Sequence, residues 1–192
     1  FQTSGANSSN NIAVGASRLN NLIVLPGQTV SVSDTILPRT RANGYKEAGV
    51  YVNGAHTTGL GGGVCQISST VYNAVKNAGL TVVQRNPHSM PVSYLPKGLD
   101  AAIAAGSKDL KFRNDYTTPV VLYTDTSNKH LTVNVLVWNQ ELAGRSFKLW
   151  AKQTGALSAD TYFTTYLNGK EISTQFVGTS RYNPYREAVN DD

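Results

Sequence analysis

The residues best suited to chemistry are Cys65, the sole cysteine of the chain, and His88, which follows it in sequence. Cys65 comes after a glycine-rich stretch, residues 59–63, and begins an amphipathic segment, so we expect it in the first turn of a helix. The positive end of a helix dipole and its exposed amides favour thiolate over thiol. A nearby imidazole can take the thiol proton and create a nucleophile, while the amides of Val64 and Cys65 stabilise an oxyanion.

A third residue is needed to orient the imidazole. The order of the Cys65 helix, a strand, His88 and then an acidic residue is analogous to the order in papain-like and transglutaminase-like thiol enzymes. Asp100 is our first choice for this role, because it follows the His88 loop at the start of a predicted strand. The alternatives that the sequence leaves open are Asp109, Asn114 and Asp115.

Each of these residues also has a purely structural interpretation. A single cysteine in a globular domain is often a small buried hydrophobe. A histidine between Pro87 and Pro91 can serve only to fix the shape of its loop. A zinc site built from Cys65, His88 and a carboxylate lacks paired ligand spacing, so we predict no metal and no other cofactor. No Lys-Ser or Lys-Thr pair follows the glycines, which argues against a phosphate loop.

Other aromatic, basic and imidazole side chains are weaker candidates for ligand binding. Tyrosines can line a groove for a glycan or peptide and arginines can meet a carboxylate or phosphate, but core-boundary and solvated positions explain them equally well. The residues concerned are Tyr45, Tyr51, Tyr72, Tyr94, Tyr116, Arg39, Arg41 and Arg85. No chemistry is assigned to His56 or His130, which lie in predicted hairpin or strand-edge contexts.

The composition bounds the class of protein. The chain has 192 residues, of which 40% are hydrophobic and 15% charged, a balance that suits one β-rich globular domain. The net charge of +5 is scattered along the chain, which argues against nucleic acid as a partner and is compatible with an anionic wall polymer or membrane surface. We expect a fragment of an exported protein, with any membrane anchor outside this chain, because it has neither a spanning segment nor an initiating Met.

Hydrophobic periodicity and turn residues predict the elements that position these groups. A first helix is predicted from Asn10 or Asn11 through Leu22 or Ile23, ending before Pro26. The helix beginning at Cys65 is predicted to end at Gly79. The predicted strands cover residues 30–33, 50–52 before an Asn53-Gly54 turn, 81–85, 110–113, 120–124 and 131–137, the last three being consecutive in one antiparallel sheet. A final hairpin is predicted from residues 162–167 and 171–177 around Asn168-Gly169.

These elements predict an α+β fold in which the helix bearing Cys65 packs on an antiparallel sheet. Residues 1–140 are expected to form the main domain, and residues 141–183 a β-rich extension of it. The polar residues 184–192 are expected to form a tail or linker.

Residues 61–74, with the sequence GGGVCQISSTVYNA, resemble the signature of the VanW family closely. The similarity continues upstream in residues 38–40 and 43–48, and downstream at His88, Ser89, residues 91–94, Pro96, Gly98 and Asp100, and again in residues 110–114. Residues 1 to about 123 are therefore covered by several ordered motifs, which argues against accidental similarity.

The resemblance implies a Gram-positive cell-envelope setting outside the membrane, because the family was named from glycopeptide-resistance clusters and its members often carry peptidoglycan-binding modules. It supplies no known reaction. Two hypotheses follow. The first is a thiol hydrolase or acyl-transferase acting on peptidoglycan peptides, with Cys65 as nucleophile, His88 as base and Asp100 as orienting residue. Its expected substrate-binding residues are Gly62, Gly63, Gln66, Ser89 and Tyr94. The second is a non-catalytic module that binds peptidoglycan or another wall polymer, or organises a resistance complex, with Cys65 and His88 fixing the loop.

Overall fold

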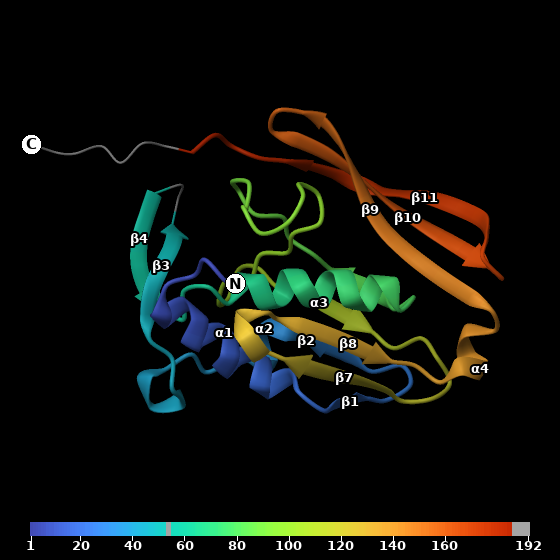
Figure 1. Cartoon of the computed structure of the whole chain (residues 1–192), viewed down its shortest axis with the longest axis horizontal. Coiled ribbons are helices and arrows are strands. Elements are labelled where there is room, and N and C mark those ends of the chain that lie inside the picture. The colour runs from blue at the N-terminus through green and yellow to red at the C-terminus, as the bar shows by residue number, and fades with distance from the viewer. Residues whose placement is uncertain (53–54, 186–192) are drawn as a thin grey trace, which may run out of the picture.

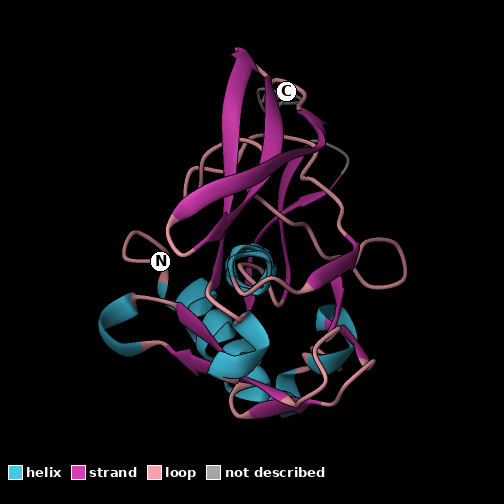
Figure 2. Ribbon diagram, turned by 90° about the vertical axis from the view of Figure 1, so that its right-hand side faces the viewer, coloured by secondary structure: helices cyan, strands magenta, loops and turns pink. Residues whose placement is uncertain are grey.

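The computed structural model describes residues 1–52 and 55–185 and places helix α3 (Cys65–Asn77) at the centre of the fold (Figures 1 and 2). Ile67, Val71 and Val75 recur every four residues on one face of α3 and are fully buried, which explains why this segment is helical and how it is anchored. The helix is followed by Gly79 at a φ of +80°, as the sequence predicts.

Helix α1 (Ala6–Leu19) begins one turn earlier than predicted and ends earlier too. Asn11 does not cap it: the side chain of Asn11 is fully buried and bonds to the backbone of Lys46 and Gly62. The chain turns just after Leu19, and Leu22 belongs to the next strand instead of continuing the helix. The prediction failed because apolar residues of a short buried strand happened to continue the helical spacing.

Two small antiparallel sheets form the lower layer in Figure 1. One has the order β1-β7-β8 and the other β2-β6-β5. Residues 110–113 therefore do not share a sheet with the two strands that follow, contrary to the prediction. Their bounds are β1 (Leu22–Val24), β7 (Val120–Asp125) and β8 (Thr132–Leu136), then β2 (Thr29–Ser31), β6 (Lys111–Arg113) and β5 (Thr81–Gln84).

Short helices and one hairpin complete this part of the chain. Strands β3 (Glu47–Val52) and β4 (Ala55–Leu60) pair with each other, and the predicted Asn53-Gly54 turn between them lies outside the described residues. The remaining elements are α2 (Val32–Thr35), α4 (Asn139–Leu142), η1 (Arg41–Asn43) and η2 (Ser127–Lys129).

A three-stranded antiparallel sheet covers the opposite side of α3 (Figure 1). It consists of β9 (Arg145–Gly155), β10 (Ser158–Leu167) and β11 (Lys170–Arg181), with β10 in the middle. The predicted turn at Asn168 and Gly169 is confirmed, and both residues have positive φ as a tight hairpin requires. The sequence did not predict β9. The sheet is tied to α3 where the Leu149 amide donates to Asn77 Oδ1 at 2.7 Å.

The predicted fold class is thus confirmed: a helix carrying Cys65 lies between antiparallel sheets, and the C-terminal part is rich in β-structure. The expected tail falls almost wholly outside the described residues, which end at 185. Within the described part of the chain, no helix combines the length and apolar character needed to cross a membrane.

Candidate active site

Cys65 is the first residue of α3, and the glycines before it determine how the chain arrives there. Gly63 has a φ of +100°, which side-chain-bearing residues rarely adopt. A Cβ atom on Gly62 would lie 2.6 Å from the carbonyl oxygens of Ala48 and Gly49. The loop therefore passes too close to β3 for any residue but glycine, and this close packing fixes the start of the helix.

Backbone amides near Cys65 are partly engaged within this loop. The amide of Val64 donates to Gly61 O at 3.4 Å and that of Gln66 donates to Gly63 O at 3.1 Å. The expectation that the Val64 amide stabilises an oxyanion is therefore not supported, since that donor already has an acceptor. The amide of Cys65 occupies the first helical position, where a donor has no carbonyl partner within the helix.

His88 lies in the long loop after β5 and is held there by Asp100. The ring Nδ1 of His88 is 2.7 Å from Oδ2 of Asp100, and the same oxygen accepts the His88 backbone amide at 2.7 Å. Asp100 is fully buried, so its position is set entirely by protein groups. Because Nδ1 is bound to the carboxylate, Nε2 is the ring nitrogen left to act on a neighbouring group.

The other oxygen of Asp100 is also fully engaged. Oδ1 accepts the hydroxyl of Tyr182 at 2.5 Å and a guanidinium nitrogen of Arg85 at 3.2 Å. A buried carboxylate is costly unless its oxygens are hydrogen-bonded. Here the donors are distributed over both oxygens, which favours the ionised form and fixes the plane of the carboxylate.

Hydrogen bonds between α3 and the chain beyond Asp100 bring the thiol to the imidazole. Ser68 and Ser69 of α3 donate their hydroxyls to Ala101 O at 2.5 Å and 3.1 Å. The thiol of Cys65 donates to Ile103 O at 3.4 Å, and His88 lies close enough to lower the thiol pKa. Cys65 thus interacts with His88, and His88 is hydrogen-bonded to Asp100, in the order that nucleophile, base and orienting group require.

Electrostatic interactions among these three residues shift the pKa of each side chain. Burial alone would raise the pKa of Asp100, but its hydrogen bonds and the charge of Arg85 lower that pKa to about 2. Burial alone would lower the pKa of His88, but its hydrogen bond to Asp100 and the adjacent Cys65 raise that pKa to about 9. Burial opposes ionisation of Cys65, yet the adjacent His88 and its charge hold the thiol pKa below its usual value. The imidazolium form of His88 is therefore favoured at neutral pH, and its charge promotes ionisation of the neighbouring thiol.

A cleft of about 850 Å³ reaches both Cys65 and His88. One wall is the loop after His88, a second is the chain around Ile103 and Lys108, and a third is the chain that follows β11. The lining residues are Cys65, residues 88–94, residues 102–104, Ser107, Lys108 and residues 183–185. Cys65 is partly exposed and lines this cleft, so a molecule in the cleft can reach its thiol.

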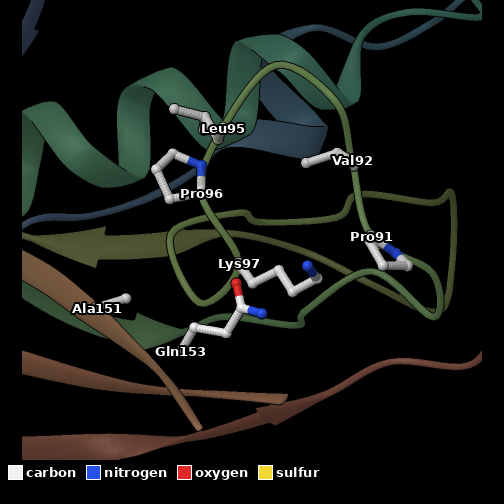
Figure 3. Close-up of a pocket in the computed structure, with 7 residues that line it drawn as sticks. All are labelled: Pro91, Val92, Leu95, Pro96, Lys97, Ala151 and Gln153. Atoms are coloured by element: carbon white, nitrogen blue, oxygen red, sulfur yellow. The ribbon is translucent and has the colours of Figure 1, made fainter. Parts of the chain in front are cut away.

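A second, smaller hollow of about 220 Å³ is lined by the 91–97 part of the same loop (Figure 3). It lies between Pro91, Val92 and residues 95–97 on one side and Ala151 and Gln153 of β9 on the other. Lys97 is its one titratable residue, and it contains no thiol, hydroxyl or imidazole. The loop thus separates a cleft that contains candidate catalytic groups from a hollow that contains none.

The structure separates the five predicted substrate-binding residues into two sets. Ser89 and Tyr94 line the cleft. Gly62, Gly63 and Gln66 are not among its lining residues. The glycines pack against β3 and α1 instead, which accounts for them without a ligand.

The alternatives to Asp100 lie away from the imidazole. Asp109 accepts hydrogen bonds from Ser31 and from the Ser33 amide. Asn114 donates to the backbone of Val24 and Thr118, and Asp115 pairs with Arg113. Their hydrogen bonds secure strands and turns of the lower layer.

The remaining candidates have mostly structural partners. Tyr45 and Tyr72 are buried, and Tyr116 donates to Ala78 O. Tyr51 and His56 have no described side chains, and the ring of His130 is 2.7 Å from the amide of Gln2. Arg41 pairs with Glu47. Within residues 1–52 and 55–185 there is no cluster of three or more His, Cys, Asp or Glu side chains able to hold a metal ion.

Sequence reasoning missed Tyr182, Ser180 and Lys108, which also belong to this region. Tyr182 and Ser180 reach Asp100 and Arg85 from the end of the C-terminal sheet, 82 and 95 residues away in sequence. No local motif marks them, because their role depends on how the sheet folds back. Lys108 lines the cleft. In the sequence, its positive charge was the one feature that could have indicated a role in binding.

Comparison with known proteins places these features in a family. The model of the family described as "VanW like protein" matches residues 7–136, a segment that includes Cys65, His88 and Asp100. The uncharacterized protein YoaR of Bacillus subtilis (strain 168) is 42% identical over 122 residues, which is 64% of this chain and 40% of that protein. The vancomycin B-type resistance protein VanW of Enterococcus faecalis (strain ATCC 700802 / V583) is 36% identical over 110 residues, 55% of this chain and 40% of that protein. The chain thus aligns with less than half the length of either relative. No solved structure shows a significant match.

Proposed function

The chain belongs to the VanW family, and on that premise we propose that it is a cysteine hydrolase or acyl-transferase that acts on peptide bonds of peptidoglycan in the cell envelope. The observation that carries the proposal is that Cys65 and His88 line one cleft and interact there, while the imidazole of His88 is hydrogen-bonded to the buried Asp100 carboxylate. A structural cysteine needs no imidazole that is itself oriented by a buried carboxylate. Nucleophilic catalysis needs both.

In the first half of the reaction, the Cys65 thiolate attacks the carbonyl carbon of the scissile peptide bond. A C–S bond forms, and the carbonyl oxygen becomes an oxyanion that the Cys65 amide is placed to stabilise. The His88 imidazolium then gives its Nε2 proton to the departing nitrogen. The C–N bond breaks, the amine leaves, and a thioester on Cys65 and a neutral imidazole remain.

In the second half, the neutral imidazole accepts a proton from water or from the amine of an acceptor peptide. The deprotonated nucleophile attacks the thioester carbonyl, and the C–S bond breaks to release the Cys65 thiolate. Water gives hydrolysis and an amine gives acyl transfer. His88 ends as imidazolium, so both side chains return to their starting charges.

Asp100 serves this cycle without changing its own charge. Its bond to Nδ1 selects the orientation that leaves Nε2 toward Cys65, and its negative charge stabilises the imidazolium. Because the pKa of Asp100 is lowered to about 2, the carboxylate stays ionised throughout the pH range of any envelope environment.

The charge of the cleft supports an acidic peptide as substrate. Lys108 is the one permanently charged side chain among the described residues that line it. The stem peptides of peptidoglycan carry free carboxylates, and an amine in the same cleft as the thiol is suited to bind one. Location outside the membrane follows from this substrate and is part of the same proposal.

Thiol reactivity and turnover test the proposal together. We expect iodoacetamide to modify Cys65 at neutral pH at least about tenfold faster than an ordinary thiol, because its thiolate fraction is higher. The wild-type protein should release or exchange peptides from purified muropeptides, detected by mass spectrometry. Cys65→Ala should lose this turnover and His88→Asn should lose both turnover and fast alkylation.

A variant at the cleft rim serves as the matched control. Ser107→Ala alters a lining residue and leaves Cys65, His88 and Asp100 unchanged, so it should keep fast alkylation. Slow alkylation of the wild type, equal to that of the His88→Asn protein, would exclude a catalytic thiol. If no fragment is released and Cys65→Ser retains full binding to sacculi, the chain is a non-catalytic wall-binding module.

A further inference from the structure

A tyrosine outside the family-matched segment completes the hydrogen-bond environment of Asp100. Tyr182 follows β11, and only 6% of its surface is exposed. Its hydroxyl donates to Oδ1 of Asp100 at 2.5 Å and accepts the backbone amide of Gly98 at 2.7 Å. The hydroxyl therefore links the carboxylate to the backbone two residues before it, and both of these bonds are buried.

Other contacts dock the same loop on the C-terminal sheet. Thr161 of β10 donates to Gly98 O at 2.8 Å, and Arg85 donates to Ser180 Oγ at 2.9 Å. Gly98 has a φ of +92°, and a Cβ there would lie 2.9 Å from Ala151 of β9. The turn that leads into Asp100 is thus pressed against β9 and β10, while Tyr182 reaches in from the end of β11.

We propose that Tyr182 is a positioning residue of the active site, which sets the rotation of the Asp100 carboxylate so that Oδ2 faces His88. The inference rests on the proposed function and extends it, because it makes the C-terminal sheet part of the machinery. Tyr182 touches neither Cys65 nor the cleft, so it acts through Asp100 and His88.

Removal of the hydroxyl has a defined physical consequence. In a Tyr182→Phe protein the buried Gly98 amide loses its acceptor, and a buried donor without a partner is costly. Oδ1 of Asp100, which was bonded to the same hydroxyl, has at the same time lost a donor. Rotation of the carboxylate toward Gly98 satisfies the amide but weakens the bond from Oδ2 to His88. The imidazolium then loses stabilisation, and with it the Cys65 thiolate.

The pH dependence of the two side chains tests this rotation. In Tyr182→Phe we expect the His88 titration, followed by NMR of the ring protons, to move down by about one pH unit, since one hydrogen bond corresponds to roughly a tenfold change in an equilibrium constant. The pH at which alkylation of Cys65 by iodoacetamide becomes fast should move up. Tyr166→Phe is the matched control, because Tyr166 lies on the outward-facing hollow formed with Lys148 and Trp150.

Both outcomes are decisive. A His88 titration and an alkylation profile that coincide with wild type would overturn the proposal, even if the melting temperature of Tyr182→Phe fell. The wild-type protein gives a second test should that variant not fold. With tyrosine labelled at Cζ, the NMR chemical shift of Tyr182 should change at the pH where His88 titrates. A Tyr182 chemical shift that stays constant through this pH would overturn the proposal as well.

These measurements need no substrate, which separates this inference from the proposed function. If the wild type turns over no muropeptide but the His88 titration depends on Tyr182, the enzyme proposal fails and the positioning role stands. If turnover is seen and is equal in wild type and Tyr182→Phe with unchanged titrations, the enzyme proposal stands and the positioning role fails.

Discussion

Two loops meet at the candidate active site, and they are held by different physical means. The glycine loop before Cys65 is held by close backbone packing, with Gly62 against the carbonyls of β3. The loop from His88 to Asp100 is held by side-chain hydrogen bonds that converge on one buried carboxylate. The first loop can adopt its conformation only because glycine has no Cβ atom. The second loop can adopt its conformation only if all of its polar partners are present.

The difference predicts how each loop responds to change. A packed backbone tolerates no added atom but has no charge to lose, so it should be insensitive to pH. A buried polar network depends on every donor and on the ionisation of its centre. Substitutions and pH therefore separate the two loops experimentally.

The largest effect is expected for Asp100→Asn. This change removes a buried charge and leaves Arg85, whose side chain is 16% exposed, without its ionic partner. Breaking a buried pair in this way costs about 3–5 kcal/mol of unfolding free energy. Urea denaturation would measure the loss. Asp115→Asn is the control, since its pair with Arg113 is exposed and should cost at most about 1 kcal/mol; equal losses in the two variants would contradict the network as described.

The next effect in size is expected for Gly62→Ala. The added Cβ would lie 2.6 Å from two backbone carbonyl oxygens, which cannot move as a flexible side chain would. Forcing an atom into such a site costs about 2–3 kcal/mol. Gly5→Ala, where no atom lies within 4 Å of the new Cβ, should cost less than about 1 kcal/mol. Thermal unfolding of both proteins checks this, and a Gly62→Ala protein as stable as wild type would mean that the loop is not held by close packing.

Acid should destabilise the protein through the network and not through the glycine loop. The pKa of Asp100 is about 2 in the folded protein and 3.8 for an ordinary aspartate, so the folded state favours the carboxylate. Its stabilisation is complete above about pH 4 and is lost as the pH falls toward 2, a change of about 2 kcal/mol. The free energy of unfolding, measured between pH 4 and pH 2, should fall by this amount in the wild type and in Gly62→Ala. The Asp100→Asn protein should lack it, and an unchanged acid slope in that variant would assign the effect to other carboxylates.

The same contrast explains what could be predicted from the sequence. The helix that begins at Cys65, its end at Gly79 and the Asn168-Gly169 hairpin follow from local rules, and the structure has all three. Local spacing also misled: Leu22 and Ile23 continued the helical pattern of α1 but lie in β1. The glycines before Cys65 mark a closely packed backbone in the sequence itself, because no other residue type fits there.

The polar network was only half visible. Cys65, His88 and Asp100 were selected as candidates because they lie in order within 36 residues, and the structure brings these three together. Tyr182 could not be selected, since its contact with Asp100 depends on a sheet whose first strand the sequence did not even predict. Long-range hydrogen bonds leave no periodicity or spacing by which a single sequence would reveal them.

The smallest effect is expected where the network meets the C-terminal sheet, in Thr161→Val. The change keeps the shape of the side chain and removes the hydroxyl that donates to Gly98 O. That carbonyl still accepts a guanidinium nitrogen of Arg85 at 3.2 Å, so it is not left unpaired. We therefore expect a loss of only about 1 kcal/mol in urea denaturation.

A double variant sharpens this last comparison. Thr161→Val and Tyr182→Phe both act on Gly98, so their costs should not add, whereas Thr161→Val and Gly62→Ala act on separate loops and should add within about 0.5 kcal/mol. Additive costs in the first pair would show that the two contacts hold Gly98 independently. In that case the sheet would only support the loop, and the carboxylate would keep its orientation without it.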